Sequence, residues 1–141
     1  MNIVTAWLMI TLLSTLSTNS FALKKSFYIQ NHSFCDIHRN RPYFNFYRQM
    51  TDQELNGPEI IDKYSSATIS IDISELDNND RPMPYSTAEY AIYCNNSSIF
   101  RHIAPRTGYI NFEYNPKNNS IVATTVQQVG ASGDIRVHIL S

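Results

Sequence analysis

Apolar and polar residues alternate with a period of two along much of this chain, which is typical of β-strands with one buried face. The clearest stretch is residues 67–74, where every second residue is Ala or Ile and the residues between them are Thr, Ser or Asp. Residues 134–139 repeat the pattern and place Ile135, Val137 and Ile139 on the inner face. One apolar face and one polar face predict an antiparallel sheet that is packed on one side.

A β-hairpin is predicted at residues 108–126. Its first strand points Ile110, Phe112 and Tyr114 towards the core, and the sequence Asn-Pro-Lys-Asn-Asn that follows is a strong turn signal before a β-branched return strand. Further strands are expected at residues 26–31, 34–38, 43–48, 88–94 and 99–102, with a loop at 129–134.

Helix signals are weak. Residues 51–54 (Thr-Asp-Gln-Glu) have the spacing of a capping box, but Gly57 and Pro58 end any helix there within about one turn. The chain shows no internal repeat and no domain boundary. About eight short strands separated by turn signals predict an all-β fold, a single antiparallel β-sandwich, with a barrel as the second choice.

The N-terminal segment predicts export. Residues 3–16 are almost wholly apolar or small and carry no charge, and the small residues Ser20 and Ala22 place a signal-peptidase site after Ala22. A transmembrane anchor is disfavoured because the apolar run is shorter than the ~20 residues that span a bilayer. We therefore expect a cleaved signal peptide at residues 1–22 and one secreted or periplasmic domain at residues 23–141, without a transmembrane segment.

The chain contains two cysteines, Cys35 and Cys94. In an oxidising compartment one intrachain disulfide is the simplest arrangement, and an intermolecular disulfide or two free thiols are the alternatives. Two thiols without histidine partners cannot complete a tetrahedral metal site. We expect no cofactor.

Residues 88–94, with Cys35 upstream, resemble the second-cysteine strand of an immunoglobulin domain. That family has a tyrosine two residues before the cysteine and a tryptophan packed on the disulfide. This chain has Ile92 at the first position, and its only tryptophan is Trp7, in the predicted signal peptide. The resemblance therefore indicates a sandwich-like strand and not membership of the family.

Charge is unevenly distributed along the chain although the formal net charge is only −1. Residues 24–48 are basic and residues 51–89 are strongly acidic. Folding can interleave the two segments, which is the simplest outcome. A dedicated nucleic-acid binder is usually strongly basic, so we expect no nucleic-acid partner.

Two kinds of chemistry have weak support. No serine lies in a Gly-x-Ser-x-Gly motif, so nucleophilic catalysis is not indicated. The carboxylates Glu75, Asp77 and Asp80 are a candidate calcium site, but the central glycine and distal glutamate of an EF-hand loop are missing. A plain surface turn is the alternative for this segment.

Residues 38–48 are the most suggestive segment for ligand binding. If residues 43–48 form a strand, the two tyrosines point away from the core and are flanked by arginines. Tyrosine buries a large area with a polar tip, and arginine binds anionic groups bidentately. The candidate ligand-binding residues are Arg39, Arg41, Tyr43, Tyr47 and Arg48. The alternative is that the tyrosines pack under a loop while the arginines pair with the acidic segment.

The leading hypothesis is an exported, non-enzymatic β-sandwich that binds a host or cell-surface ligand: an anionic glycan or other small anion, a lipid headgroup or a protein. Replacing Arg41 and Arg48 by Ala is then expected to weaken binding without lowering the melting temperature. One alternative is a secreted enzyme or enzyme inhibitor, which needs His102 or His138 beside a carboxylate. Another is a structural subunit of a surface assembly, joined by strand addition at an exposed edge.

Overall fold

The computed structural model describes residues 21–41, 48–94, 107–127 and 135–140. Within these ranges every regular element is a strand. The strands are β1 (Phe21–Asn31), β2 (Asp36–Asn40), β3 (Arg48–Gln49), β4 (Leu55–Asn56), β5 (Ile60–Ile61), β6 (Ser66–Ser74), β7 (Ser86–Tyr93), β8 (Gly108–Asn115), β9 (Ser120–Gln127) and β10 (Ile135–Leu140).

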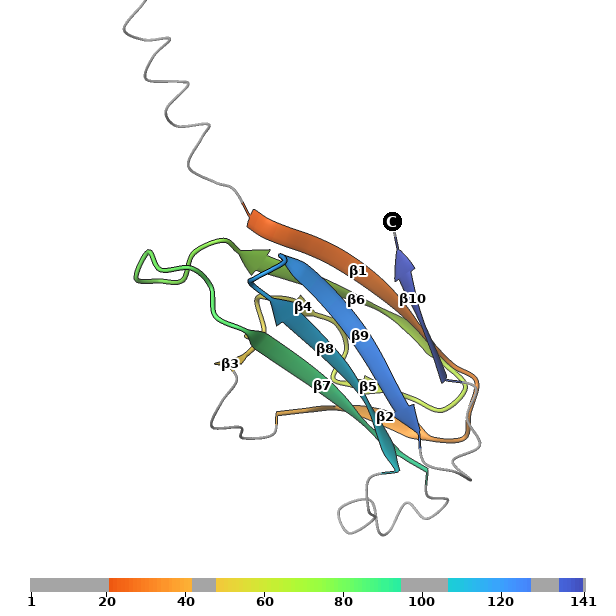
Figure 1. The fold of residues 1–141 in the computed structure, drawn as a ribbon. Coiled ribbons are helices and arrows are strands. Elements are labelled where there is room, and N and C mark those ends of the chain that lie inside the picture. The colour runs from red at the N-terminus through yellow and green to blue at the C-terminus, as the bar shows by residue number, and fades with distance from the viewer. Residues whose placement is uncertain (1–20, 42–47, 95–106, 128–134, 141) are drawn as a thin grey trace, which may run out of the picture.

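The strands form two sheets that pack face to face (Figure 1). The four-stranded sheet has the order β10-β1-β6-β4, and the six-stranded sheet has the order β5-β2-β7-β8-β9 with β3 paired to β7. All pairs are antiparallel except β3–β7, which is parallel. The predicted antiparallel β-sandwich is confirmed, and the sheets stay open rather than closing into a barrel.

The core lies between the inner faces of the two sheets. Phe27 of β1 meets Phe112 of β8 across the interface, with ring centroids 4.9 Å apart. The alternation predicted for β6 is confirmed, since Ile69, Ile71 and Ile73 are fully buried. Each such side chain contributes roughly 1.5–3 kcal/mol when it leaves water, so the inner faces hold the two sheets together.

The inner face of β10 is buried at the start of the strand but not at its end. Ile135 is buried as expected, but Ile139 is 63% exposed. Ile139 pairs with Phe27 and so lies on the inner face of its sheet. Since β10 is an edge strand, its inner face is covered less completely than that of the central β1.

The turn before β4 forms as the sequence predicts. Thr51 Oγ1 accepts a hydrogen bond from the Glu54 amide at 3.2 Å, and Glu54 Oε1 accepts one from the Thr51 amide at 2.9 Å. These are the two reciprocal bonds of a capping box. The chain makes a single turn and enters β4 at Leu55, so no helix follows.

The predicted intrachain disulfide between Cys35 and Cys94 is present, with a Cα–Cα distance of 4.2 Å. It continues the β2–β7 ladder by one position, because Asp36 pairs with Tyr93. The bridge therefore joins neighbouring strands of one sheet. In immunoglobulin domains the bridge joins two sheets, so the resemblance does not extend to the disulfide.

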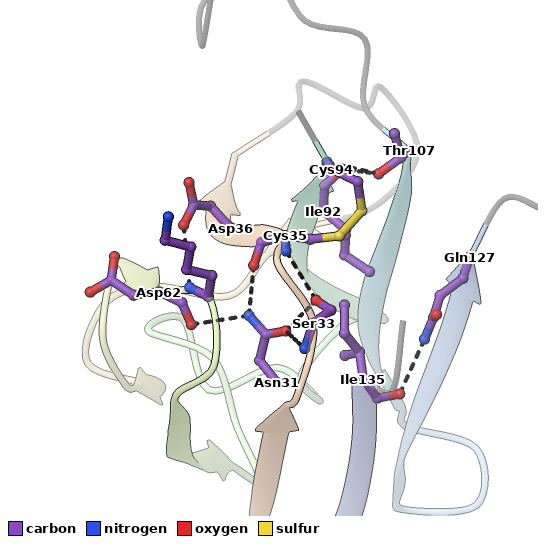
Figure 2. The surroundings of a disulfide bond; sticks show 11 residues. Asn31, Ser33, Cys35, Asp36, Asp62, Ile92, Cys94, Thr107, Gln127 and Ile135 are labelled. Carbon is purple, nitrogen blue, oxygen red and sulfur yellow. Dashed lines mark hydrogen bonds between the residues drawn. A yellow bond between two sulfur atoms is a disulfide. The ribbon is translucent and has the colours of Figure 1, made fainter. Parts of the chain in front are cut away.

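Beside the disulfide, the chain crosses from β1 in one sheet to β2 in the other (Figure 2). The fully buried Asn31 organises this crossing. Its amide nitrogen donates to Cys35 O at 2.7 Å and to Asp62 O at 3.0 Å, while its Oδ1 accepts from the Ser33 amide at 3.1 Å and from the Ser33 hydroxyl. The Asn31 side chain thus satisfies backbone groups that the crossing takes out of the sheets.

β1 begins earlier than expected, at Phe21. Its register against β6 shifts between Phe21 and Leu23 and is regular from Leu23 onward. Leu23 is the residue that the predicted cleavage would leave at the N-terminus. Within the described ranges, the structure contains no helix that is long and apolar enough to cross a membrane.

Candidate functional site

The three candidate arginines lie beside β7 on either side of an undescribed segment. Arg39 belongs to β2 and Arg41 follows it, while Arg48 opens β3. The other two candidates, Tyr43 and Tyr47, lie outside the described residues. Of the strand predicted at 43–48, the structure describes only Arg48, which pairs in parallel with Ser86 of β7.

Two of the arginines share two carboxylates. Arg41 binds Glu59 through both terminal nitrogens, at 2.6 and 3.1 Å, and reaches Asp52 Oδ1 at 3.1 Å. Arg39 Nη1 lies 2.9 Å from the same Asp52 oxygen and 4.0 Å from Glu59. We call these four residues the arginine–carboxylate network; it ties the end of β2 to the turns before β4 and β5.

The members of this network differ in exposure. The Arg39 side chain is only 4% exposed, whereas Asp52 is 75% and Glu59 59% exposed. Arg39 shares the inner face with Ile37 and pairs with the buried Tyr90 across the ladder. Its aliphatic stem is therefore buried while its charged end meets the carboxylates at the surface.

Arg48 forms a separate and less exposed pair with Glu54. Its two terminal nitrogens donate to the two Glu54 oxygens at 2.6 and 2.7 Å, and Nε donates to the Ser86 hydroxyl at 3.1 Å. The Glu54 side chain is 13% exposed. Removing Arg48 would leave a largely buried carboxylate unpaired, so Arg48→Ala is expected to lower stability, contrary to the expectation from sequence.

Electrostatics keeps these carboxyl groups ionised. Hydrogen bonds from Arg41 hold the pKa values of Asp52 and Glu59 below their usual range. Burial alone would raise the pKa of Glu54, but the hydrogen bonds from Arg48 and Thr51 outweigh it and lower this pKa. The same contacts with Glu59 and Asp52 raise the pKa of Arg41.

The pairing of the arginines with the acidic segment is the arrangement that the alternative interpretation predicted. Arg39, Arg41 and Arg48 all bind carboxylates from that segment. Contact of these arginines with a ligand stays a prediction. An anionic ligand would have to compete with carboxylates that are already in place, whereas a partner with both charge signs would not.

Sequence reasoning did not identify Asp52, Glu54 and Glu59 as parts of this site. The capping-box spacing was the available signal for two of them, because that turn presents Asp52 and Glu54 beside β2 and β3. Glu59 is positioned by the next turn, where Tyr90 Oη donates to Pro58 O at 2.9 Å. Burial raises the pKa of this tyrosine to about 12, so it remains a donor at neutral pH.

The calcium candidate has a structural explanation. Asp77 Oδ1 accepts hydrogen bonds from the amides of Asn79 at 2.8 Å and Arg81 at 2.9 Å, which closes the turn. These bonds lower the pKa of Asp77. Throughout the described part of the chain, no group of three or more His, Cys, Asp or Glu residues is arranged to hold a metal ion. The geometry therefore gives Glu75, Asp77 and Asp80 no support as a calcium site.

The histidines of the enzyme alternative are also placed in part. His138 lies on the exposed face of β10 and contacts Gln30 Oε1 at 2.9 Å. His102 lies outside the described residues. His38 packs edge-on against Tyr93, with ring centroids 5.4 Å apart. For His138 the hydrogen bond that the structure records is with an amide and not with a carboxylate.

Comparison of the chain with protein-family models, with curated proteins and with solved structures gave no significant match. The class defined by the fold is a disulfide-linked, open β-sandwich.

Proposed function

We propose that this chain is an exported, non-enzymatic β-sandwich that binds a protein on a cell surface. The recognition element is the segment 42–47, in which four of the six residues are aromatic: Tyr43, Phe44, Phe46 and Tyr47. Aromatic side chains of this kind dominate binding hot spots. The predicted signal peptide and the disulfide support export, because disulfides persist in oxidising compartments.

The observation that carries the proposal is the fixation of both residues that flank this segment. Arg41 precedes it and binds Glu59 bidentately, and Arg48 follows it and binds Glu54 bidentately. A segment with fixed ends has fewer conformations to lose when a partner binds. In this proposal the arginines anchor the two ends of the segment, rather than acting as the main ligand contacts.

The surroundings of the segment favour a protein over an anionic glycan or a lipid headgroup. Arg41, Asp52 and Glu59 are 44%, 75% and 59% exposed and carry both charge signs. An aromatic centre inside a polar rim is the usual composition of a protein–protein interface. An anionic ligand would instead be favoured by arginines without carboxylate partners.

The test is binding of the fluorescently labelled, oxidised chain to cultured animal cells and to bacterial cells, measured by flow cytometry. Replacing Tyr43 and Tyr47 by Asn is expected to weaken binding about tenfold or more, as loss of a hot spot does. The control is Tyr64→Asn, because this tyrosine is 68% exposed and its φ of 57° is one that asparagine tolerates.

A protein partner further requires that protease treatment of the cells abolishes binding. Anionic phospholipid vesicles and acidic oligosaccharides should not compete. Unchanged binding of the Tyr43/Tyr47 variant would refute the placement of the site. Binding that survives protease treatment but is lost to vesicles or to oligosaccharides would assign the partner to lipid or glycan instead.

A further inference from the structure

The outer edge of the six-stranded sheet is a long strand without charge. β9 ends the strand order of that sheet, and its eight residues (Ser-Ile-Val-Ala-Thr-Thr-Val-Gln) include no charged residue and no proline. On its outer face, Val122 is 55% and Val126 38% exposed, and Thr124 between them is also exposed. Natural proteins usually protect such an edge with charge, proline or a bulge, since it can pair with another strand.

The other edges of the two sheets differ from β9. β4 and β5 are two residues long, which is too short to pair stably with a second chain. β10 has a length closer to that of β9 but carries Arg136 and His138. In the described part of the chain, β9 is therefore the long edge strand whose own residues carry no charge.

The backbone of β9 presents hydrogen-bonding groups outward. Ile121 O accepts a hydrogen bond from Lys25 Nζ of β1 at 3.1 Å, so this carbonyl points away from β8. Val126 O, five positions on, lies against Gly108 of β8. Alternate residues of a strand point the same way, so Ala123 and Thr125 also present their N–H and C=O groups at the open edge.

We propose that β9 pairs with β9 of a second copy of this chain, antiparallel and across a two-fold axis at Thr124. In this register Thr124 lies opposite Thr124 of the second copy, and Val122 lies opposite Val126. β-Branched and Thr–Thr pairs of this kind stabilise antiparallel strands. A register centred on Ala123 would instead place Val122 opposite Thr124 and lose both valine pairs.

A second copy is the occupant that these observations favour over an unrelated strand, because β9 is complementary to itself. Its lack of charge means that pairing brings no like charges together, whereas self-pairing of β10 would bring Arg136 or His138 beside another cationic or titratable side chain. The resulting two-fold dimer closes on itself and does not grow into a filament. Arg48, which follows the proposed recognition segment, pairs with β7 and not with β9.

The test uses the chain expressed with its own N-terminal segment and purified in oxidised form. Light scattering coupled to gel filtration is expected to give the molar mass of two chains, falling towards one on dilution. Thr124→Lys and Thr124→Glu each place two like charges opposite one another at the axis, which should raise the dimer dissociation constant about tenfold or more. Mixing the two variants places Lys opposite Glu and should restore the dimer.

Thr68→Lys is the matched control, because Thr68 is also exposed but lies on β6 in the interior of the other sheet. It should leave the dimer intact, and all variants should retain the wild-type melting temperature. If the wild type is monomeric at every concentration, the proposal is overturned. This holds even if the monomer captures an extended peptide through β9. Persistence of the dimer in Thr124→Lys, or failure of the mixture to restore it, would overturn the register.

Discussion

Asn31 is the buried polar side chain on which the crossing between the two sheets depends, so Asn31→Ala should be strongly destabilising. The side chain is 0% exposed and connects the backbone of three residues: Ser33, Cys35 and Asp62. Alanine would remove all of its hydrogen bonds and leave two carbonyls and one amide without this partner. No other side chain in the described part of the chain makes as many of these connections at the crossing.

The size of the effect follows from the cost of unsatisfied buried groups. Each such group costs about 1–3 kcal/mol, and rearrangement or water recovers part of this loss. We therefore expect Asn31→Ala to lower the free energy of unfolding by about 3 kcal/mol. For a domain of this size the melting temperature should fall by about 10–15 °C.

Urea denaturation of the oxidised protein, followed by far-ultraviolet circular dichroism, measures this free energy. The control is Asn118→Ala in the exposed turn between β8 and β9, where the side chain accepts a hydrogen bond of 2.6 Å from the nearby Ser120 hydroxyl. That change should stay within about 0.5 kcal/mol of wild type. If Asn31→Ala with an intact disulfide were also within about 1 kcal/mol of wild type, the assigned role of Asn31 would be refuted.

Three further predictions test other parts of the fold. Replacing Cys35 and Cys94 together by Ala should lower the free energy of unfolding by about 4 kcal/mol in the chain-entropy model, because the bridge spans a sequence separation of 59; denaturant titration without reductant measures this. In the arginine–carboxylate network, Arg41 lowers the pKa values of Asp52 and Glu59. The stability that these two carboxylates add is therefore complete above their unfolded pKa values near ~4 and is lost as the pH falls through the folded values. The denaturation midpoint should drop below about pH 4, and it should drop less in Arg41→Gln. Gly108→Ala should lower the free energy of unfolding by about 1–3 kcal/mol, because the alanine Cβ would collide with Val126 O in the neighbouring strand. Thermal denaturation measures this, and an unchanged stability would contradict the observed β8–β9 register.

The strands that could be predicted from sequence are those long enough to show alternation. β6, with nine residues, and β8 and β9, with eight each, were predicted with nearly correct bounds. β4 and β5 were missed because two residues carry no periodic signal. They form because Leu55 and Ile61, each 1% exposed, fill the core while their backbones pair with β6 and β2.

The candidate site shows a different limit of sequence reasoning. The type and order of the arginines indicated a charged surface, but their partners come from turns whose positions depend on strand pairing. Asp52 reaches Arg39 because β4 pairs with β6, and Glu59 reaches Arg41 because β5 pairs with β2. No local pattern gives the distance between two such turns, although the charge asymmetry did indicate that the two segments could pair.

The two proposals combine into one geometric consequence. In the β9–β9 dimer, β8 and β9 of each copy separate the two β7 strands, so five strand spacings of ~4.8 Å place them about 24 Å apart within one continuous sheet. β3, which follows the aromatic segment, pairs with β7, so the two β3 strands of the dimer lie on opposite sides of the paired β9 strands. The dimer therefore carries two copies of the proposed recognition segment, and these can engage two partners on one cell surface. Bivalent engagement raises apparent affinity by about 10²–10⁴ without any new contact. Thr124→Lys should therefore weaken binding to cells while leaving the affinity of a single domain for its isolated partner unchanged, a combination that a change in the recognition segment itself cannot produce.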